Sequence, residues 1–361
     1  GLLIRDQWVR QTMLEMGHAA ARGRFVHLYL NGQYWGIYNL AEDIDDAYAA
    51  IQYGGSKSDY DVIDSGRLDS GELSTWQTVL DLAAGGIQDP EAYTQVQQYV
   101  DLQNFIDFVL VRMFVGDRDW NGGDWYAIRD RIGDGPFRFF TWDSEDVLPE
   151  SAAAVLPPTV GSTDSIVLLW QALQESPAFR RAFADRVQRH LRLDGLLTPE
   201  RNIARWDRYA TPVSAAIVAE SARWGDYRRD VQPIGEGPHE LYTADDHWRI
   251  EADRVRGEFF AHRTEHVLAV LRDAGLYPTM APPTFSQPGG TLTEGFALAI
   301  TAPEGEIYYT LDGLDPVNAD GSVADTAIRY EAAIELTQDT VVQARARVAE
   351  QWSALVSATF Y

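Results

Sequence analysis

An apolar segment near the middle of the chain runs directly into an acidic, glycine-containing turn, and this junction constrains the fold most. Residues 104–115 (NFIDFVLVRMFV) are apolar on most sides, which predicts a buried core helix over 101–115. The turn that follows, GDRDWNGGD, contains Asp119 and Asp124. We therefore expect a core helix whose end carries carboxylates.

The next segment predicts a β-hairpin that ends at a third aspartate. WYAIRDR and PFRFFTWDSED are strand-like runs on either side of the turn IGDG, and the second run contains Asp143. A tight turn and the end of a hairpin can meet in one place. We expect Asp119, Asp124 and Asp143 to lie together in one cleft.

These three carboxylates are the residue types that phosphoryl transfer requires. The reaction needs one acid near the attacking hydroxyl and two oxygen ligands for Mg²⁺ at the phosphates. Protein kinases space the first two as D-x-x-x-x-N and place the metal-binding aspartate after a hairpin. Here the spacing is D-x-x-x-x-D, followed by a hairpin and Asp143. Taken singly, each aspartate is equally explained as a turn residue; the ordered combination favours a site for Asp119 and Asp143 and leaves Asp124 open.

The N-terminal third has its elements in the order of a kinase. Residues 5–16 predict a helix that stops at Gly17, and RFVHLYL and QYWGIYNL, joined by Asn31-Gly32, predict a hairpin. A short acidic crossover follows, then a strand (YDVID) and helices at about 75–84 and 90–99. In this order residues 41–44 are the hinge whose backbone meets adenine, which makes Glu42, Asp43 and Ile44 the nucleotide-binding candidates.

The C-terminal half predicts a helical region and then a β-rich module. Residues 146–162 predict a loop, and 163–275 are mainly helical, ending in a long helix from about Trp248 to Ala274. TMAPPTFSQPGG is the clearest linker, and the short strand-like runs after it predict a small sandwich. We expect an α+β fold with two domains, 1–278 and 279–361.

Composition excludes several classes of protein. The formal charge of −24 disfavours nucleic acid as a partner. The chain has no cysteine, which excludes disulfides, thiolate zinc sites and cysteine nucleophiles. No apolar run reaches the ~18 residues of a membrane helix.

Few basic residues offer themselves as phosphate ligands. Lys57 is the only lysine, and its surroundings, GGSKSDYD, predict a solvated turn rather than a phosphate site. Arg223, Trp224 and Arg263 could reach a phosphate or stack on a ligand, but interhelical packing is the favoured role for all three.

Several of these segments resemble the CotH (spore coat protein H)-type kinase family. LNGQYWGIYNLAEDID is similar to its NGxYxGxYxLxExID segment, and VGDRDWNGGDWYAIRD with FRFFTWDSED is similar to its GNxDWxxNNxYxYRD…WRFxxWDxE stretch. The resemblance covers about residues 1–278. It implies a kinase-like fold that uses ATP and Mg²⁺, with Asp119 as the catalytic aspartate and Asp143 as the metal ligand. Asp124 stands where the family usually has Asn, and Glu42 matches the family's glutamate at the nucleotide crossover.

The resemblance also concerns what lies outside this chain. The family's phosphate-covering strands and its basic residue for the α and β phosphates would precede Gly1, so we expect the kinase-like domain to lack its first N-lobe strands. We also expect a signal peptide upstream and an extracellular or cell-surface location.

The C-terminal segment, from IYYTLDGLDPVNADGS to SALVSATF, resembles the β-sandwich at the C-terminus of chitobiases and β-hexosaminidases. In that family it is an accessory module, and we expect no catalytic role for it. Trp352 or Tyr308, if exposed, would be the residues to contact a glycan.

The leading hypothesis is an atypical protein kinase that transfers phosphate from ATP to Ser or Thr of a secreted or surface protein. Asp119 would act on the hydroxyl, while Asp143 and Asp124 hold Mg²⁺. The alternative is a non-catalytic surface or glycan-binding protein that uses a kinase-like fold. A third interpretation makes the acidic pocket a structural Ca²⁺ site.

Overall fold

A computed structural model describes residues 2–120, 123–150, 156–158, 164–233, 235, 239–293 and 295–361. Contacts divide the chain into two compact units. The first comprises 1–77, 98–167 and 196–267, and the second 78–97, 168–195 and 268–361. The boundary expected between 278 and 279 rests on sequence composition, and it stays a prediction.

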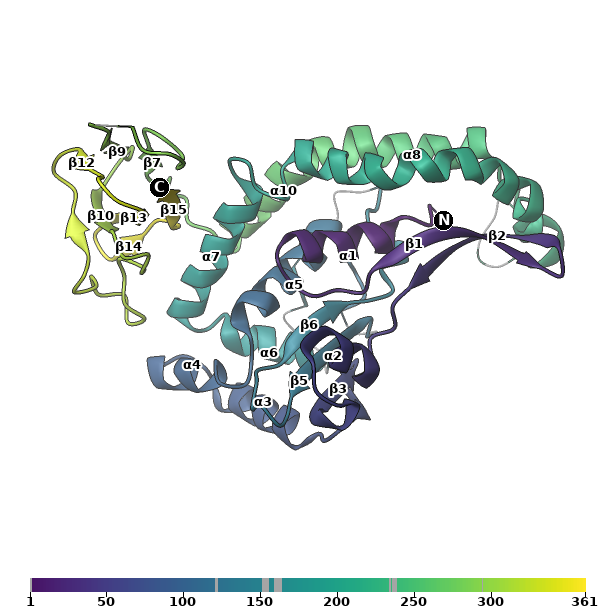
Figure 1. Cartoon of the computed structure of the whole chain (residues 1–361), viewed down its shortest axis with the longest axis horizontal. Helices are drawn as coiled ribbons and strands as arrows, with labels where there is room; N and C mark the ends of the chain where they lie inside the picture. The colour runs from purple at the N-terminus through teal and green to yellow at the C-terminus, as the bar shows by residue number, and fades with distance from the viewer. Residues whose placement is uncertain are drawn as a thin grey trace. The chain divides into compact units, whose positions relative to one another are not determined.

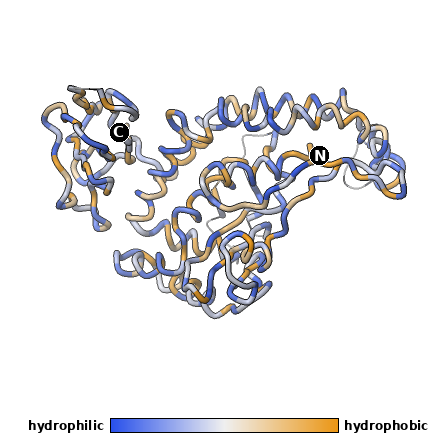
Figure 2. Tube along the Cα trace, viewed as in Figure 1, coloured by the Kyte–Doolittle hydropathy of each residue, from blue (hydrophilic) through white to orange (hydrophobic). Residues whose placement is uncertain are grey.

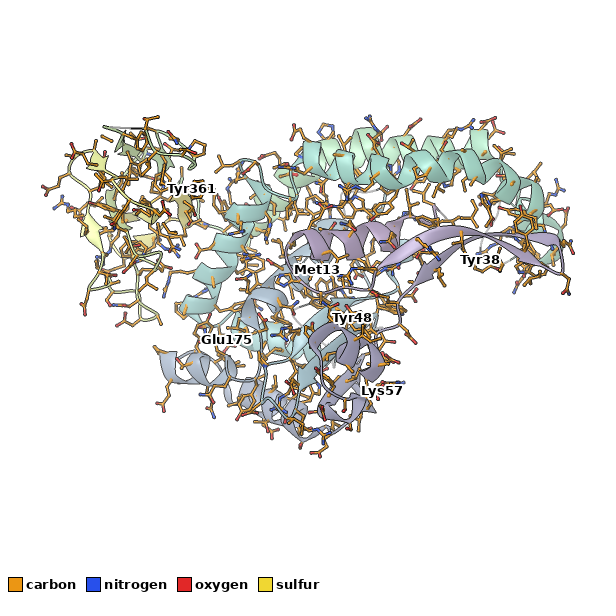
Figure 3. The ribbon with its side chains drawn as sticks, in the orientation of Figure 1. Met13, Tyr38, Tyr48, Lys57, Glu175 and Tyr361 are labelled. Carbon is orange, nitrogen blue, oxygen red and sulfur yellow. The ribbon has the colours of Figure 1, made fainter. Side chains whose placement is uncertain are left out.

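The first unit begins with the predicted helix and hairpin (Figure 1). Helix α1 spans Arg5–Glu15 and buries Trp8, Val9 and Met13, the last of which is labelled in Figure 3. Strands β1 (Gly23–Leu30) and β2 (Gln33–Ala41) pair antiparallel as a two-stranded sheet. Asn31 and Gly32 both have positive φ, 52° and 80°, as the type I′ turn of a tight hairpin requires. Both predictions are confirmed.

The hairpin packs on the long helix α8 (Pro199–Trp224). Glu220 Oε2 accepts a hydrogen bond from the backbone N–H of Ile37 at 2.7 Å, and Trp224 Nε1 donates to the carbonyl of Trp35 at 2.5 Å. Figure 2 shows hydrophilic and hydrophobic residues alternating along α8. Its buried positions are spaced as on one face of a helix: Asn202, Arg205, Trp206, Val213 and Ile217.

Gly36 allows this close approach between β2 and α8. Its φ is +140°, and a Cβ there would lie 2.8 Å from Glu220 Oε2 and 3.1 Å from Trp224 Nε1. We expect Gly36→Ala to lower the free energy of unfolding by about 1–3 kcal/mol, through backbone strain and the separation of hairpin and helix. Urea unfolding measures this. Gly257→Ala is the matched control, because that helical glycine has open space around its Cβ position; equal midpoints for the two variants would contradict the steric argument.

A second sheet of the first unit lies beneath α1 and carries the predicted hairpin. Its strand order is β4-β3-β5-β6, all antiparallel. The strands are β3 (Tyr60–Asp64), β4 (Arg67–Ser70), β5 (Trp125–Asp130) and β6 (Arg138–Thr141). Helix α2 (Asp46–Tyr53) covers one part of it, and their shared core includes Ile44, Tyr48, Tyr60, Val62, Ile128 and Phe140.

Helix α5 (Leu102–Val115) is the predicted buried helix, and nearly all of its residues are buried. Asp101 caps its first turn by accepting from the N–H of Asn104 at 3.1 Å. Gly116 ends it in the left-handed region, with φ 71°. The ring of Phe105 packs at 4.9 Å from Phe139 of β6, so the helix is anchored on the sheet and its C-terminal end is fixed.

The remaining helices follow the predicted pattern. They are α3 (Ser74–Gly85), α4 (Pro90–Val96), α6 (Ser165–Leu173), α7 (Pro177–Leu191), α9 (Arg249–Arg254) and α10 (Phe260–Asp273). The long helix expected over 248–274 is present as consecutive helical segments, interrupted by a π-helical turn at Val255–Phe259. Two other π-helical turns lie at Tyr227–Val231 and Ala244–Trp248. Residues 151–155 and 159–163 of the predicted loop lie outside the described part. No described helix has the length and apolar character needed to cross a bilayer.

The second unit includes the predicted β-rich module. Its main sheet joins β10 (Glu306–Thr310), β13 (Thr340–Val348) and β15 (Val356–Phe360) with the short strands β11 (Ile328–Arg329) and β14 (Gln351–Trp352). Two small sheets, β7 (Thr284–Phe285) with β9 (Ile300–Thr301) and β8 (Ala297–Leu298) with β12 (Ile334–Glu335), complete it. The core contains Leu298, Ile300, Val342, Ala344 and Phe360. The mixed fold with an all-β C-terminal region is confirmed.

Trp352 does not have the exposure that a glycan contact would need. Its side chain is buried, and its Nε1 donates to the carbonyl of Gly321 at 3.0 Å. The expectation for Trp352 was therefore wrong, because a tryptophan in a two-residue strand at the end of a sheet packs against the loop beside it. Tyr308 is partly buried and packs edge-to-face on Trp352 at 5.6 Å.

Within the second unit, one arginine joins α7 to the β-rich module. Arg345 of β13 is 1% exposed. Its Nη1 and Nη2 donate to the two carboxylate oxygens of Asp185 on α7 at 2.8 and 2.6 Å. Its Nε and Nη2 donate to Asp315 at 2.8 and 2.6 Å. Asp185 also accepts from the N–H of Leu355 at 2.8 Å, so the module is bonded to α7 by a buried ionic network.

Candidate functional site

Asp124 and Asp143 stand at the open end of the β5–β6 hairpin. Trp125 and Thr141 are the last paired residues of the two strands, and Trp142 N–H donates to the carbonyl of Asp124 at 3.2 Å. Both aspartates have left-handed backbones, with φ 61° and 53°. The hairpin register thus places one aspartate on each strand at the same end of the sheet.

Asp119 lies on the turn after α5, and an arginine of that helix holds the turn. Arg112 Nε donates to Asp117 Oδ2 at 2.7 Å, and its Nη2 donates to the carbonyl of Asp119 at 2.9 Å. The N–H of Asp119 donates to Asp117 Oδ1 at 2.8 Å. The peptide groups on both sides of Asp119 are therefore fixed while its residue stays exposed.

Arg112 is a residue that the sequence reasoning missed. It is 2% exposed and its guanidinium lies 4.7 Å from the ring centroid of Trp120. The available signal was a single arginine in an otherwise apolar helix, one turn before the acidic turn, because a buried charge needs a partner nearby.

The electrostatics bring the three predicted carboxylates together. Burial raises the pKa of Asp124 to about 6, and the charges of Asp119 and Asp143 add to the rise while Arg112 opposes it. A hydrogen bond with Asp143, together with burial, raises the pKa of Glu145 to about 7. Neighbouring carboxylates thus repel one another at this end of the hairpin, as they do where a cation is to be bound.

The donor set fits a magnesium–nucleotide complex better than an all-protein metal cage. Among the described residues, no three His, Cys, Asp or Glu side chains are grouped to enclose a metal ion. Asn121 and Gly122 of the predicted turn lie outside those residues. Mg²⁺ is commonly held by one or two carboxylates, with phosphate oxygens and water as the other ligands. Asp143 and Asp124 would be its protein ligands.

Helix α1 contacts the turn that contains Asp143. Asp6 Oδ1 accepts from the N–H of Ser144 at 3.2 Å, and Arg10 Nη2 lies 2.8 Å from Asp6 Oδ2. Arg5 Nη1 donates to the carbonyl of Glu145 at 3.2 Å. Nothing in the local sequence pointed to these contacts, which join segments more than 130 residues apart.

The predicted hinge has two kinds of residue. Glu42 Oε2 accepts from the N–H of Arg22 at 2.8 Å, and its own N–H donates to the Arg22 carbonyl at 2.9 Å, so its side chain holds the strand ends together. Ile44 is buried and Asp43 is exposed. Within the described chain, the peptide groups of Asp43 and Ile44 form no backbone–backbone hydrogen bond. Adenine binding at 42–44 stays a prediction, and it would rest on the backbone.

Two of the basic candidates have other surroundings. Lys57 is exposed in a 3₁₀ turn, with Nζ 3.7 Å from Asp46 (Figure 3). Arg263 is buried, and its Nε and Nη2 donate to the carbonyls of Phe114 and Met113 at 2.6 and 3.0 Å. Burial lowers the pKa of Arg263 to about 10, yet it stays cationic at neutral pH and complements the C-terminal end of α5. Packing, the favoured role for Arg263, is what the contacts show.

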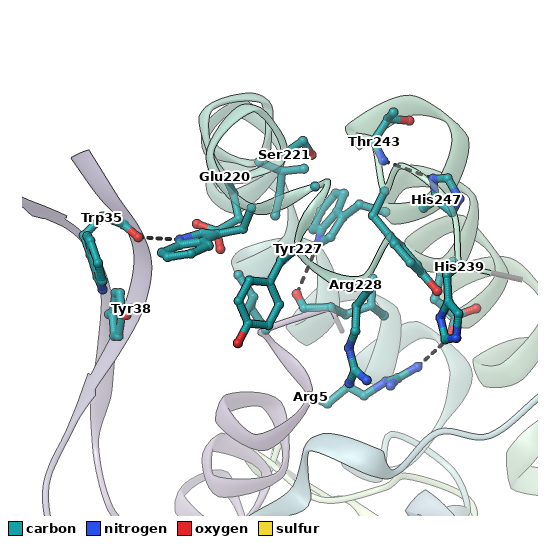
Figure 4. Close-up of a pocket in the computed structure, with 18 residues that line it drawn as sticks. Arg5, Trp35, Tyr38, Glu220, Ser221, Tyr227, Arg228, His239, Thr243 and His247 are labelled. Carbon is teal, nitrogen blue, oxygen red and sulfur yellow. Dashed lines mark hydrogen bonds and ion pairs between the residues drawn. The ribbon is translucent and has the colours of Figure 1, made fainter. Parts of the chain in front are cut away.

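A separate cavity of about 850 Å³ lies in the first unit (Figure 4). Its walls come from the segment before α1, from β2, from the end of α8 and from residues 239–251. Asp119, Asp124 and Asp143 do not line it.

Comparison with protein families gives two matches. A family model described as CotH kinase protein matches residues 1–263, well over half of the chain, and a model described as Fn3 associated matches residues 297–360. No curated protein matches the chain. The aspartate cluster and the predicted hinge lie inside the first match, and the β-sandwich-type module corresponds to the second.

Proposed function

Because the chain belongs to the CotH kinase family, we propose that it transfers phosphate from ATP to serine or threonine hydroxyls of a secreted or surface protein. Family membership makes it a kinase-like, nucleotide-using protein. The finer proposal rests on one observation, the meeting of Asp119, Asp124 and Asp143 at the end of α5 and the β5–β6 hairpin.

Each of these side chains has a distinct part in the proposed reaction. Asp119 orients the acceptor hydroxyl and takes its proton as the oxygen attacks the γ-phosphorus. The bond from that phosphorus to the bridging oxygen breaks, and ADP leaves with the electron pair. Magnesium bound by Asp143 and Asp124 supplies positive charge at the phosphate oxygens.

The surrounding contacts keep these side chains in place. Arg112 and Asp117 fix the peptide groups of Asp119. Asp6 and Arg5 of α1 bond to the backbone directly after Asp143. A site held by bonds to backbone groups needs little reorganisation when substrate binds, which favours catalysis by positioning.

The test uses the full chain with ATP labelled at the γ-phosphate, MgCl₂ and protein acceptors. We expect Mg²⁺-dependent ATP binding by calorimetry, and label on serine or threonine located by mass spectrometry. Omission of Mg²⁺ is the control and should abolish transfer. Absence of both nucleotide binding and transfer would overturn the proposal.

A further inference from the structure

The cavity of the first unit has the size and wall composition of a small-molecule site. Its volume of about 850 Å³ lies within the roughly 300–1,000 Å³ of typical ligand pockets. Aromatic side chains reach it from three separate segments: Trp35 and Tyr38 of β2, Trp224 and Tyr227 at the end of α8, and Tyr242 before the turn at Ala244–Trp248. Figure 4 shows Trp35 and Tyr38 across the cavity from Tyr227.

The ring faces of these residues are not used up by stacking on one another. Trp224 meets Trp35 at 5.2 Å and 86°, and meets Tyr227 at 5.8 Å and 84°. Edge-to-face pairs leave faces available, in contrast to stacked pairs. Tyr38 and Tyr242 are 44% and 46% exposed, which is high for aromatic residues that line a concavity.

The charged groups of the wall already have partners. Glu251 lies 2.5 Å from Arg5 and 2.7 Å from Arg254. Glu220 accepts from the N–H of Ile37, and His247 Nε2 lies 3.0 Å from Glu240. The cavity therefore has no surplus charge from these groups to select an ion, and the chain's net charge of −24 repels anions.

A neutral ligand with a flat apolar face and hydroxyl groups at its edge suits such a wall. Hydrogen-bonding side chains, Ser221, Arg228 and His239, line the same space as the exposed rings. The C–H face of a pyranose ring packs on an aromatic face, and its hydroxyls bond to donors and acceptors around it. We propose that the cavity binds a neutral carbohydrate, at a site distinct from the aspartate cluster and independent of phosphate transfer.

The test titrates the full chain with neutral disaccharides (cellobiose, chitobiose, maltose and lactose) by calorimetry and saturation-transfer NMR, without ATP. We expect at least one to bind, and Tyr38→Ala and Tyr242→Ala each to weaken it about tenfold through loss of one ring face. These two residues are exposed and lie on different elements, so a folding defect common to both is not expected; thermal melts check this.

The matched control is Tyr29→Ala. Tyr29 is on the same hairpin as Tyr38 and is 60% exposed, but it does not line the cavity. Its variant should bind the sugar as the unchanged chain does. The proposal is overturned if no disaccharide binds, if Tyr29→Ala weakens binding as much as the cavity variants, or if adenosine or an aromatic peptide binds there in place of sugar. None of these results bears on phosphate transfer, which is measured separately with ATP.

Discussion

Asp119→Asn is expected to lower the rate of phosphate transfer about 10²–10⁴-fold, the range for loss of a general base. The substitution keeps the shape of the side chain and removes its capacity to take the hydroxyl proton. The bonds from the Asp119 peptide to Arg112 and Asp117 involve only backbone atoms of Asp119, so the turn should stay in place. ATP affinity should change little, and the loss should appear in kcat.

Asp143→Asn tests the other part of the same site and should differ in kind. Asn tolerates the left-handed backbone found at Asp143 but removes one negative charge from the magnesium ligands. We expect weaker Mg²⁺-dependent ATP binding as well as lost transfer, measured by calorimetry and by incorporation of label.

The matched control for Asp143 is Asp134→Asn at the opposite end of the same hairpin. Asp134 is also an exposed aspartate with a left-handed backbone, φ 52°. It should leave transfer unchanged. Equal labelling by the unchanged chain and the variants at 119 and 143 would remove the kinase proposal, while loss in the Asp134 variant would point to a general effect on the hairpin.

Arg345→Met is expected to destabilise the second unit by about 3–5 kcal/mol, the cost of leaving buried charge without its partner. Asp185 is the group left behind, since Arg345 donates to both of its carboxylate oxygens. Burial raises the pKa of Asp185 and Arg345 opposes that rise, so removal of Arg345 favours the protonated carboxyl. Urea unfolding of the full chain, followed by fluorescence, measures the change.

Arg329→Met is the control for this variant because it removes an arginine of the same sheet. Arg329 pairs with Glu306 at 2.7 Å, with side chains 58% and 49% exposed, and such surface pairs contribute about 0–1 kcal/mol. The double variant Asp185→Leu with Arg345→Met should recover much of the lost stability, since no charge is then left buried. Similar midpoints for the two single arginine variants would contradict a stabilising role of the buried network.

The elements that could be predicted from sequence are those determined by local pattern. The apolar run at 104–115 predicted α5 because a helix without a polar face must be buried, and Asn31-Gly32 predicted its hairpin because few residues adopt positive φ twice in succession. The β5–β6 hairpin, ending at Asp124 and Asp143, followed from the same kind of signal.

The contacts that were missed depend on tertiary approach. The bond from Asp6 to the Ser144 peptide joins residues far apart in the chain, and no periodicity records it. The burial of Trp352 depends on Gly321, in a loop 31 residues away. The cavity beside Trp35 and Tyr38 also required three segments to be placed together. Local sequence fixes neither these distances nor the partners of buried charges such as Arg112.

The seam at Gly36 has a kinetic consequence. A two-stranded hairpin alone is marginally stable in water, so β1 and β2 persist because β2 is bonded to Glu220 and Trp224 of α8. The amide proton of Ile37 should therefore exchange with deuterium only when this seam opens. Since Trp35 and Tyr38 are on β2 and Trp224 is on α8, the exchange rate at that single amide reports how often the cavity's walls separate.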